Sequence, residues 1–427
     1  MLLSISANLL CLALAQEPLE LGHADRIEAD IRHLVSFGTR NTLSETESDT
    51  RGIGAARRWL RSEMKSISKE FHNNRLKVEL QFFDLAPGRR TPDGVRLANV
   101  VATLPGKDPN RLIVVSGHYD SMPSSPTDGE SDAPGANDDA SGTVAVMEAA
   151  RLLHGLKPRA TIVFLAVAGE EQGLLGAAAQ AKYWQEQGKQ IDAMFTMDIV
   201  GGAVGTSGKH EPNRLRVFSE GVPSLGPKVI GSDNDAPSRQ VARYLKRTAE
   251  AAIPGFELTL ILRQDRYLRG GDHRAFNQLG FAAIRLTEPH ENYTHQHQDV
   301  RKEKGVQYGD LPEFVDFIYV GKVATSVASA IREMSKAPAA PKKVTVSIRE
   351  LTPHTTLQWQ ANQEKDLGGY AVLIRHTNEA TWSERHDVGN VTSATFEGYS
   401  KDDFLFAVES YDKVGNRSLP VYPTPKR

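Results

Sequence analysis

Hydrophobic and polar positions follow one another along the chain with two different periods. Ile27, Ile31 and Leu34 lie one helical turn apart, and residues 53–64 show the same spacing, which is typical of amphipathic helices. Residues 76–82 instead alternate with period two, which predicts a half-buried strand. Further along, strands are expected at 99–104, 111–117, 160–168, 193–199 and 282–286, and helices at 143–153, 174–187, 238–252 and 311–334.

This alternation of strands and helices predicts the fold class. Residues 112–115 and most of 160–168 are apolar without interruption, which is typical of strands covered on both faces. We therefore expect an α/β fold built on a mixed, mostly parallel sheet with helices on both faces. In such sheets, ligands bind beyond the carboxyl ends of the strands.

The pattern changes near residue 335. Residues 336–342 (KAPAAPK) break the helical spacing and predict a short linker. Residues 343–427 then carry short alternating segments separated by turns, which predicts a small antiparallel β-sandwich. With Trp359, Trp382 and the strand-like segment 404–408, this part resembles a fibronectin type III domain.

An apolar run opens the chain from Leu2 to Leu14 and ends in an A-x-A pattern at Ala15. The run is shorter than the roughly 20 residues that a membrane span needs, so it predicts a signal peptide over residues 1–15. A buried N-terminal helix is the alternative. We expect an exported protein, extracellular or periplasmic, with a catalytic domain over 17–335 and no stable membrane span.

Composition narrows the possible partners and metal ligands. Lys and Arg number 51 against 53 Asp and Glu, so the net charge of −2 offers no basic excess for nucleic acid. The one cysteine, Cys11, lies in the apolar run, so a CxxC zinc site is excluded. Any metal would need His, Asp and Glu ligands.

Acidic and imidazole residues cluster just after the predicted strands. The segments are 117–121 (GHYDS), 135–142 (GANDDASG), 169–173 (GEEQG) and 197–201 (MDIVG), with a histidine-rich stretch at 290–299. Each segment taken alone is more simply explained as a helix cap or a turn. Because they converge on one edge of the sheet, they indicate a single site. Imidazoles with carboxylates suit zinc, and two cations about 3.5–4 Å apart need a bridging carboxylate.

Residues 27–331 resemble the secreted zinc aminopeptidases of clan MH, relatives of the bacterial leucyl aminopeptidases. The four segments above and the late block 272–276 (DHRAF) carry this resemblance, in family order. It implies two zinc ions per chain and Glu170 as the general base. Asp120 would orient a zinc-bound imidazole. The ligands that it implies are His118, Asp138 as the bridge, Glu171, Asp198 and a late histidine.

The late histidine has three candidates: His290, His295 and His297. Ligands of this family usually stand four residues before an aspartate, and His295 has that spacing to Asp299, so His295 is preferred. The resemblance also implies a cis peptide after Asp138. Three residues are assigned to the substrate pocket: Asp272, His273 and Tyr293, the last as an oxyanion donor.

The resemblance predicts an aminopeptidase that acts on peptides with a free N-terminus. Glu170 would deprotonate the attacking water and return the proton to the leaving amine. Alternatives are a single-zinc glutaminyl cyclase, a binding or adhesion protein with an inactive peptidase domain, and a carboxypeptidase. The last would use arginines for the substrate carboxylate, and four are near the late block: Arg263, Arg266, Arg269 and Arg274.

Overall fold

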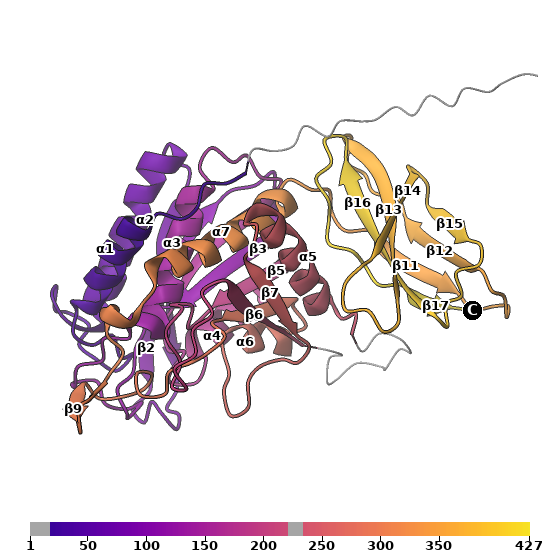
Figure 1. Cartoon of the computed structure of the whole chain (residues 1–427). Coiled ribbons are helices and arrows are strands. Elements are labelled where there is room, and N and C mark those ends of the chain that lie inside the picture. The colour runs from indigo at the N-terminus through magenta and orange to yellow at the C-terminus, as the bar shows by residue number, and fades with distance from the viewer. Residues whose placement is uncertain (1–17, 221–233) are drawn as a thin grey trace, which may run out of the picture.

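The fold is that of a computed structural model, which describes residues 18–220 and 234–427 (Figure 1). The predicted signal peptide over 1–15 lies outside the described residues. A larger α/β unit comes first along the chain, and a smaller unit of strands lies beside it (Figure 1). None of the described helices combines the length and the apolar character that a membrane crossing needs.

An eight-stranded sheet forms the centre of the larger unit, in the order β1-β2-β4-β3-β5-β8-β6-β7. Four neighbouring pairs are parallel and three are antiparallel, so the predicted mixed sheet is confirmed. The strands are β1 (Lys77–Leu85), β2 (Val95–Leu104), β3 (Asp108–His118), β4 (Ala160–Val167), β5 (Gln190–Met197), β6 (Arg214–Ser219), β7 (Glu257–Ile261) and β8 (Ala283–Thr287).

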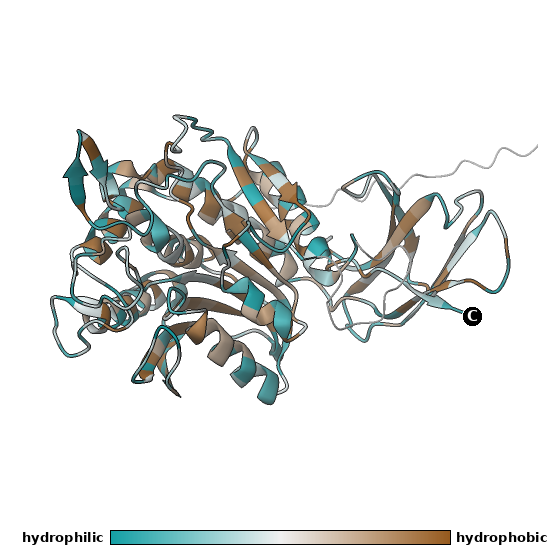
Figure 2. Ribbon diagram, turned by 90° about the horizontal axis from the view of Figure 1, so that it is seen from below, coloured by the Kyte–Doolittle hydropathy of each residue, from teal (hydrophilic) through white to brown (hydrophobic). Residues whose placement is uncertain are grey.

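Helices cover both faces of this sheet, as the apolar strands predicted. Along β3, Ile113 and Val115 pack into one core while Leu112 and Val114 pack into the other, because successive side chains point to opposite faces. The first core includes residues of α1 (Ala24–Val35), α2 (Gly52–His72), α3 (Ser141–Leu152), α5 (Pro237–Ala252) and α7 (Phe317–Met334). The second includes residues of α4 (Leu175–Glu186) and α6 (His273–Gln278). Figure 2 shows the hydrophobic strands between these layers.

The C-terminal strands form two sheets around a separate core. The sheets have the orders β15-β12-β11-β17 and β14-β13-β16. Leu357, Tyr370 and Val372 are fully buried between them. The likeness to a fibronectin type III domain stays a prediction. The strands are β11 (Lys342–Ser347), β12 (Thr355–Gln360), β13 (Leu367–His376), β14 (Glu384–Gly389), β15 (Ser393–Phe396), β16 (Phe404–Asp412) and β17 (Thr424–Lys426).

A buried ion pair joins the two units. Arg375 of β13 donates to both carboxylate oxygens of Asp235 at 2.9 Å, and the two side chains are 2% and 0% exposed. Arg243 of α5 also contacts Asp235, at 3.2 Å. A cavity between the units is lined by Arg111 and Gln190, near the beginnings of β3 and β5. The contact therefore lies opposite the sheet edge where these strands end.

Replacing Arg375 by alanine should lower the free energy of unfolding by about 3 kcal/mol. The change leaves the Asp235 charge buried with Arg243 as its remaining partner, and breaking a buried pair costs about 3–5 kcal/mol. Urea denaturation followed by tryptophan fluorescence measures this loss. The matched control is Arg159→Ala, because Arg159 pairs across the same contact with Asp366, which is 52% exposed. Exposed pairs contribute about 0–1 kcal/mol. Equal losses for both variants would contradict the role of the buried pair.

Candidate metal centre

Three neighbouring strands bring the predicted site residues to one edge of the sheet. His118 is the last residue of β3, and its register partner on β4 is Val167, three residues before Glu170. Asp198 directly follows β5, the other neighbour of β3. Because these strands are parallel, their carboxyl ends lie together, as the sequence predicts.

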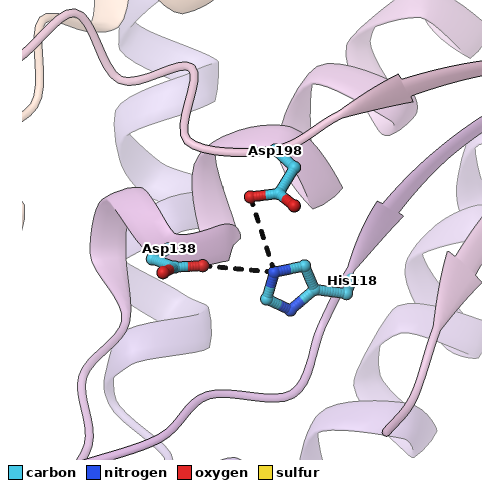
Figure 3. Close-up of side chains that lie close together, drawn as sticks. All are labelled: His118, Asp138 and Asp198. Atoms are coloured by element: carbon cyan, nitrogen blue, oxygen red, sulfur yellow. Dashed lines mark ion pairs between the residues drawn. The ribbon is translucent and has the colours of Figure 1, made fainter. Parts of the chain in front are cut away.

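His118, Asp138 and Asp198 form the first group (Figure 3). His118 Nε2 lies 3.2 Å from Asp138 Oδ1 and 3.8 Å from Asp198 Oδ1, and all three side chains are buried. One possible ligand atom from each residue lies within 4.8 Å of the others. One imidazole and two carboxylates are a donor set that suits zinc.

Asp138, Glu171 and His297 form a second group. His297 Nε2 lies 3.1 Å from Asp138 Oδ2 and 3.1 Å from Glu171 Oε2. Asp138 thus directs one oxygen toward His118 and the other toward His297. A carboxylate shared in this way has the arrangement that bridging two cations requires.

The sequence-based choice of His295 is wrong, because the structure brings His297 to the cluster instead. The ring of His295 stacks on Phe314, with centroids 3.8 Å apart, and burial lowers the pKa of His295 to about 4. Asp299, which suggested His295 by its spacing, accepts hydrogen bonds from the amide and hydroxyl of Ser124. His290 faces Glu211 rather than the cluster.

Asp120 lies behind His118 and joins it to the Glu170–Glu171 segment. His118 Nδ1 is 3.1 Å from the Asp120 carbonyl oxygen and 3.6 Å from its carboxylate. The Asp120 carboxylate also accepts hydrogen bonds from the amides of Glu170 and Glu171, at 3.3 and 3.1 Å. Asp120 can therefore fix the His118 ring with Nε2 facing the carboxylates.

The peptide bond between Asp138 and Asp139 is cis, as predicted. The Asp139 carboxylate points away from both groups and accepts hydrogen bonds from the amides of His118, Gly142 and Ile199, at 2.9 to 3.2 Å. Adjacent aspartates thus have different tasks: Asp138 faces the two histidines, and Asp139 ties together three segments that form the site.

The buried charges of the cluster fit a pair of bound cations. Glu171 Oε1 is buried and has no hydrogen-bond partner in the described part of the chain. Burial opposes ionisation of Asp138, but hydrogen bonds from His118 and His297 hold its pKa well below the usual value. Two imidazoles and three carboxylates, one of which has an oxygen without a hydrogen-bond partner in the described chain, are an appropriate donor set for zinc, and bound cations would offset their buried negative charge.

Glu170 lies near the cluster but belongs to neither group. The structure records no ion pair or hydrogen bond of its carboxylate with the described residues. Burial, opposed by His118 and aided by Asp198 and Glu171, raises the pKa of Glu170 well above its usual value. Bound cations would favour the ionised form. This position is suited to a base that stays off the metals.

The three residues assigned to the substrate pocket occupy different environments. Asp272 is fully buried with both carboxylate oxygens unpartnered in the described chain, and burial raises its pKa to about 7. His273 Nε2 lies 2.9 Å from the Gln264 carbonyl oxygen, so it supports the loop before α6. Tyr293 is 59% exposed, and no recorded contact joins its hydroxyl to the cluster. The three substrate-pocket roles stay predictions.

Sequence reasoning missed Arg285 on β8, a fully buried residue whose guanidinium lies 2.7 Å from Asp198 Oδ1. A lone arginine inside an apolar strand carried no motif, so only the pairing of β8 with β5 reveals it. Of the arginines near the late block, Arg266 pairs with Glu291, and Arg263 lies over the Tyr267 ring. Arg269 Nη1 lies 3.2 Å from His297 Nδ1.

Solved structures with similar folds include two kinds of enzyme. The LapA aminopeptidase of Legionella pneumophila aligns with a TM-score of 0.53 at 21% identity, over 74% of this chain and 73% of its own. A glutaminyl cyclase of Bacteroides thetaiotaomicron aligns with a TM-score of 0.51 at 18% identity, over 74% and 99%. At these identities the likeness concerns the fold alone.

Sequence comparisons are more specific. The model of Peptidase family M28 matches residues 99–307, which include every residue of both groups. A probable zinc metalloprotease of Leptosphaeria maculans is 43% identical over 94% of this chain and 95% of its own length. A probable zinc metalloprotease of Pyrenophora teres f. teres is 42% identical over 94% and 85%. The chain therefore belongs to peptidase family M28, a family of zinc metallopeptidases.

Proposed function

We propose that this chain is a dizinc aminopeptidase that removes the N-terminal residue of peptides. The observation that supports it most is the sharing of Asp138: its two oxygens face His118 and His297, each with a further carboxylate nearby. Membership of family M28 and the zinc metalloprotease relatives support the metal and the reaction class.

In this proposal one metal ion would be held by His118, Asp198 and Asp138, and the other by Asp138, Glu171 and His297. Two zinc ions bound there would polarise the scissile carbonyl and activate a water molecule. Glu170 accepts the proton that the water gives up and later donates it to the leaving amine. Asp120 keeps the His118 ring in its orientation, and the buried carboxylates attract the free α-amino group of the peptide.

Two alternatives use the same edge of the sheet. A glutaminyl cyclase with one zinc is supported only by likeness of fold, and the pair of groups sharing Asp138 favours two metals. For a carboxypeptidase, Arg269 near His297 would be the available guanidinium, since Arg266 is paired with Glu291. A binding protein with an inactive peptidase domain would not need all the metal-binding side chains and Glu170.

Elemental analysis and substrate profiling test the proposal together. We expect two zinc ions per chain and chelator-sensitive hydrolysis of aminoacyl nitroanilides and short peptides, with N-acetylated counterparts left uncut. One zinc per chain with cyclisation of N-terminal glutamine would indicate the cyclase. Release of C-terminal residues from N-blocked peptides would indicate the carboxypeptidase. Absence of any hydrolysis by the zinc-loaded protein would favour the inactive binding protein.

We further propose that the protein is exported to the extracellular or periplasmic space, on the basis of the apolar run from Leu2 to Leu14. N-terminal sequencing of protein collected from the culture medium or periplasm of its host tests this. A mature chain beginning near Gln16 would support export with cleavage. Intact Met1 on protein confined to the cytosol would contradict it.

A further inference from the structure

Three successive backbone amides in front of α3 donate hydrogen bonds to one residue, Asp310. The amide of Ala136 donates to the Asp310 carbonyl at 3.1 Å. The amides of Asn137 and Asp138 donate to its carboxylate, at 2.9 Å and 2.6 Å to Oδ2. Asp310 is 5% exposed, so water does not compete effectively for these bonds.

Arg40 holds the same segment from its carbonyl side. Its guanidinium is buried and donates to the carbonyl oxygens of Pro134 at 2.6 Å and Gly135 at 2.9 Å. A third hydrogen bond runs from Arg40 Nε to the Tyr119 carbonyl, next to His118, at 2.8 Å. The Arg40 guanidinium on the carbonyl oxygens and the Asp310 carboxylate on the amides therefore fix residues 134–138 in place.

Close packing leaves no room for a side chain at position 135 of this segment. Gly135 has a φ of 52°, and a Cβ atom there would lie 2.6 Å from both the Asp138 carbonyl oxygen and the Ser121 Cβ. A side chain at position 135 would therefore clash, and the positive φ also favours glycine there. The position of the Asp138 carboxylate thus follows from the two charged residues that hold the backbone before it.

We propose that Asp310 and Arg40 are positioning residues for the reaction: they fix the backbone of Asp138 so that one carboxylate oxygen faces His118 and the other faces His297. The inference rests on the proposed dizinc function. Displacements of about 1 Å at a reacting centre can lower rates about 10²-fold. A residue that merely stabilised the fold would change the unfolding free energy without this selective effect.

The path of the chain supports this role. His297 contacts the carboxylate of Asp138, and Asp310 accepts a hydrogen bond from the backbone amide of Asp138. Between them the chain leaves the site in a hairpin of β9 (Arg301–Glu303) and β10 (Val306–Tyr308). Both ends of segment 297–310 therefore contact Asp138, so Asp310 also fixes the end of the segment that carries His297.

The test is Asp310→Asn in the full-length, zinc-loaded protein. The new amide keeps the size of the side chain, but it loses the negative charge that strengthens both bonds to Oδ2, and its NH₂ group would replace Oδ1, which accepts from the Asn137 amide at 3.0 Å. We expect kcat to fall about 10- to 100-fold with KM changed less than about threefold. Zinc affinity, measured by competition with a chromophoric chelator, should fall about tenfold for the same geometric reason.

The matched control is Asp316→Asn. The Asp316 carboxylate also accepts a backbone hydrogen bond, from the Tyr319 amide at 3.0 Å, but it caps α7 and does not contact residues 134–138. Because asparagine caps a helix about as well as aspartate, the control should keep kcat, zinc affinity and thermal stability close to wild type. If Asp310→Asn does not fold, Arg40→Lys is measured by the same criteria, because lysine keeps the charge but cannot make the three directed bonds.

Two outcomes would overturn the inference: kcat and zinc affinity of the folded variant within about twofold of wild type, or equal losses in Asp316→Asn. The arm that measures zinc affinity needs no peptide substrate. A wild-type protein that binds zinc but cleaves no peptide therefore contradicts the proposed function, while the comparison of zinc affinities still decides the positioning role.

Discussion

Replacing Glu170 by glutamine should lower kcat about 10²- to 10⁴-fold, the range that general acid–base catalysis contributes. Glutamine keeps the size of the side chain but cannot accept the proton of the attacking water or return it to the amine. Since Glu170 belongs to neither candidate metal group, the variant should retain the wild-type zinc content. Steady-state hydrolysis of an aminoacyl nitroanilide and elemental analysis measure the two quantities.

The adjacent glutamate supplies the matched comparison. Glu171 contacts His297 through Oε2, and its Oε1 has no hydrogen-bond partner among the described residues, so Glu171→Gln should lose zinc as well as activity. Excess zinc should partly restore Glu171→Gln and should not restore Glu170→Gln. A Glu170→Gln variant with near wild-type turnover would show that another group is the base, and zinc loss in that variant would make Glu170 a ligand.

Period and hydrophobicity were sufficient to predict the fold class and most of the sheet. A strand buried on both faces needs an unbroken apolar run, and such a run is visible in the sequence. Residues 112–115 show this, because their side chains alternate between the two cores. Two strands, Arg214–Ser219 and Glu257–Ile261, were not predicted. They lie at one edge of the sheet, and short runs that begin with charged residues are equally compatible with a loop.

Most of the candidate site could be predicted because strand ends fix where side chains meet. His118 ends β3, while Glu170 and Asp198 follow the neighbouring parallel strands β4 and β5, so their proximity is a consequence of topology. The supporting residues could not be predicted in this way. Arg40, Arg285 and Asp310 act through tertiary contacts with backbone or carboxylate groups far away in sequence, and none stands in a motif.

The late histidine shows where local spacing fails. His295 and His297 stand two residues apart in a turn, and both have an aspartate within reach along the chain. The backbone of His297 takes a positive φ of 52°, which no spacing rule indicates. The His297 ring then faces Asp138 and Glu171, while the ring of His295 packs on Phe314. Tertiary packing, rather than distance to Asp299, selects the residue.

His297→Ala should therefore lower kcat/KM about 10³-fold or more and reduce the zinc content to about one ion per chain. The variant removes the one imidazole of the group formed with Asp138 and Glu171, and metal polarisation is worth several kcal/mol, at 1.36 kcal/mol per tenfold change in rate. His295→Ala is the matched control, since the same substitution two residues earlier removes only a ring stacked on Phe314. It should cost some stability and retain both zinc ions and most of the activity. If His295→Ala loses zinc while His297→Ala keeps it, the second metal position is not the one formed by Asp138, Glu171 and His297, and the proposed shared role of Asp138 fails with it.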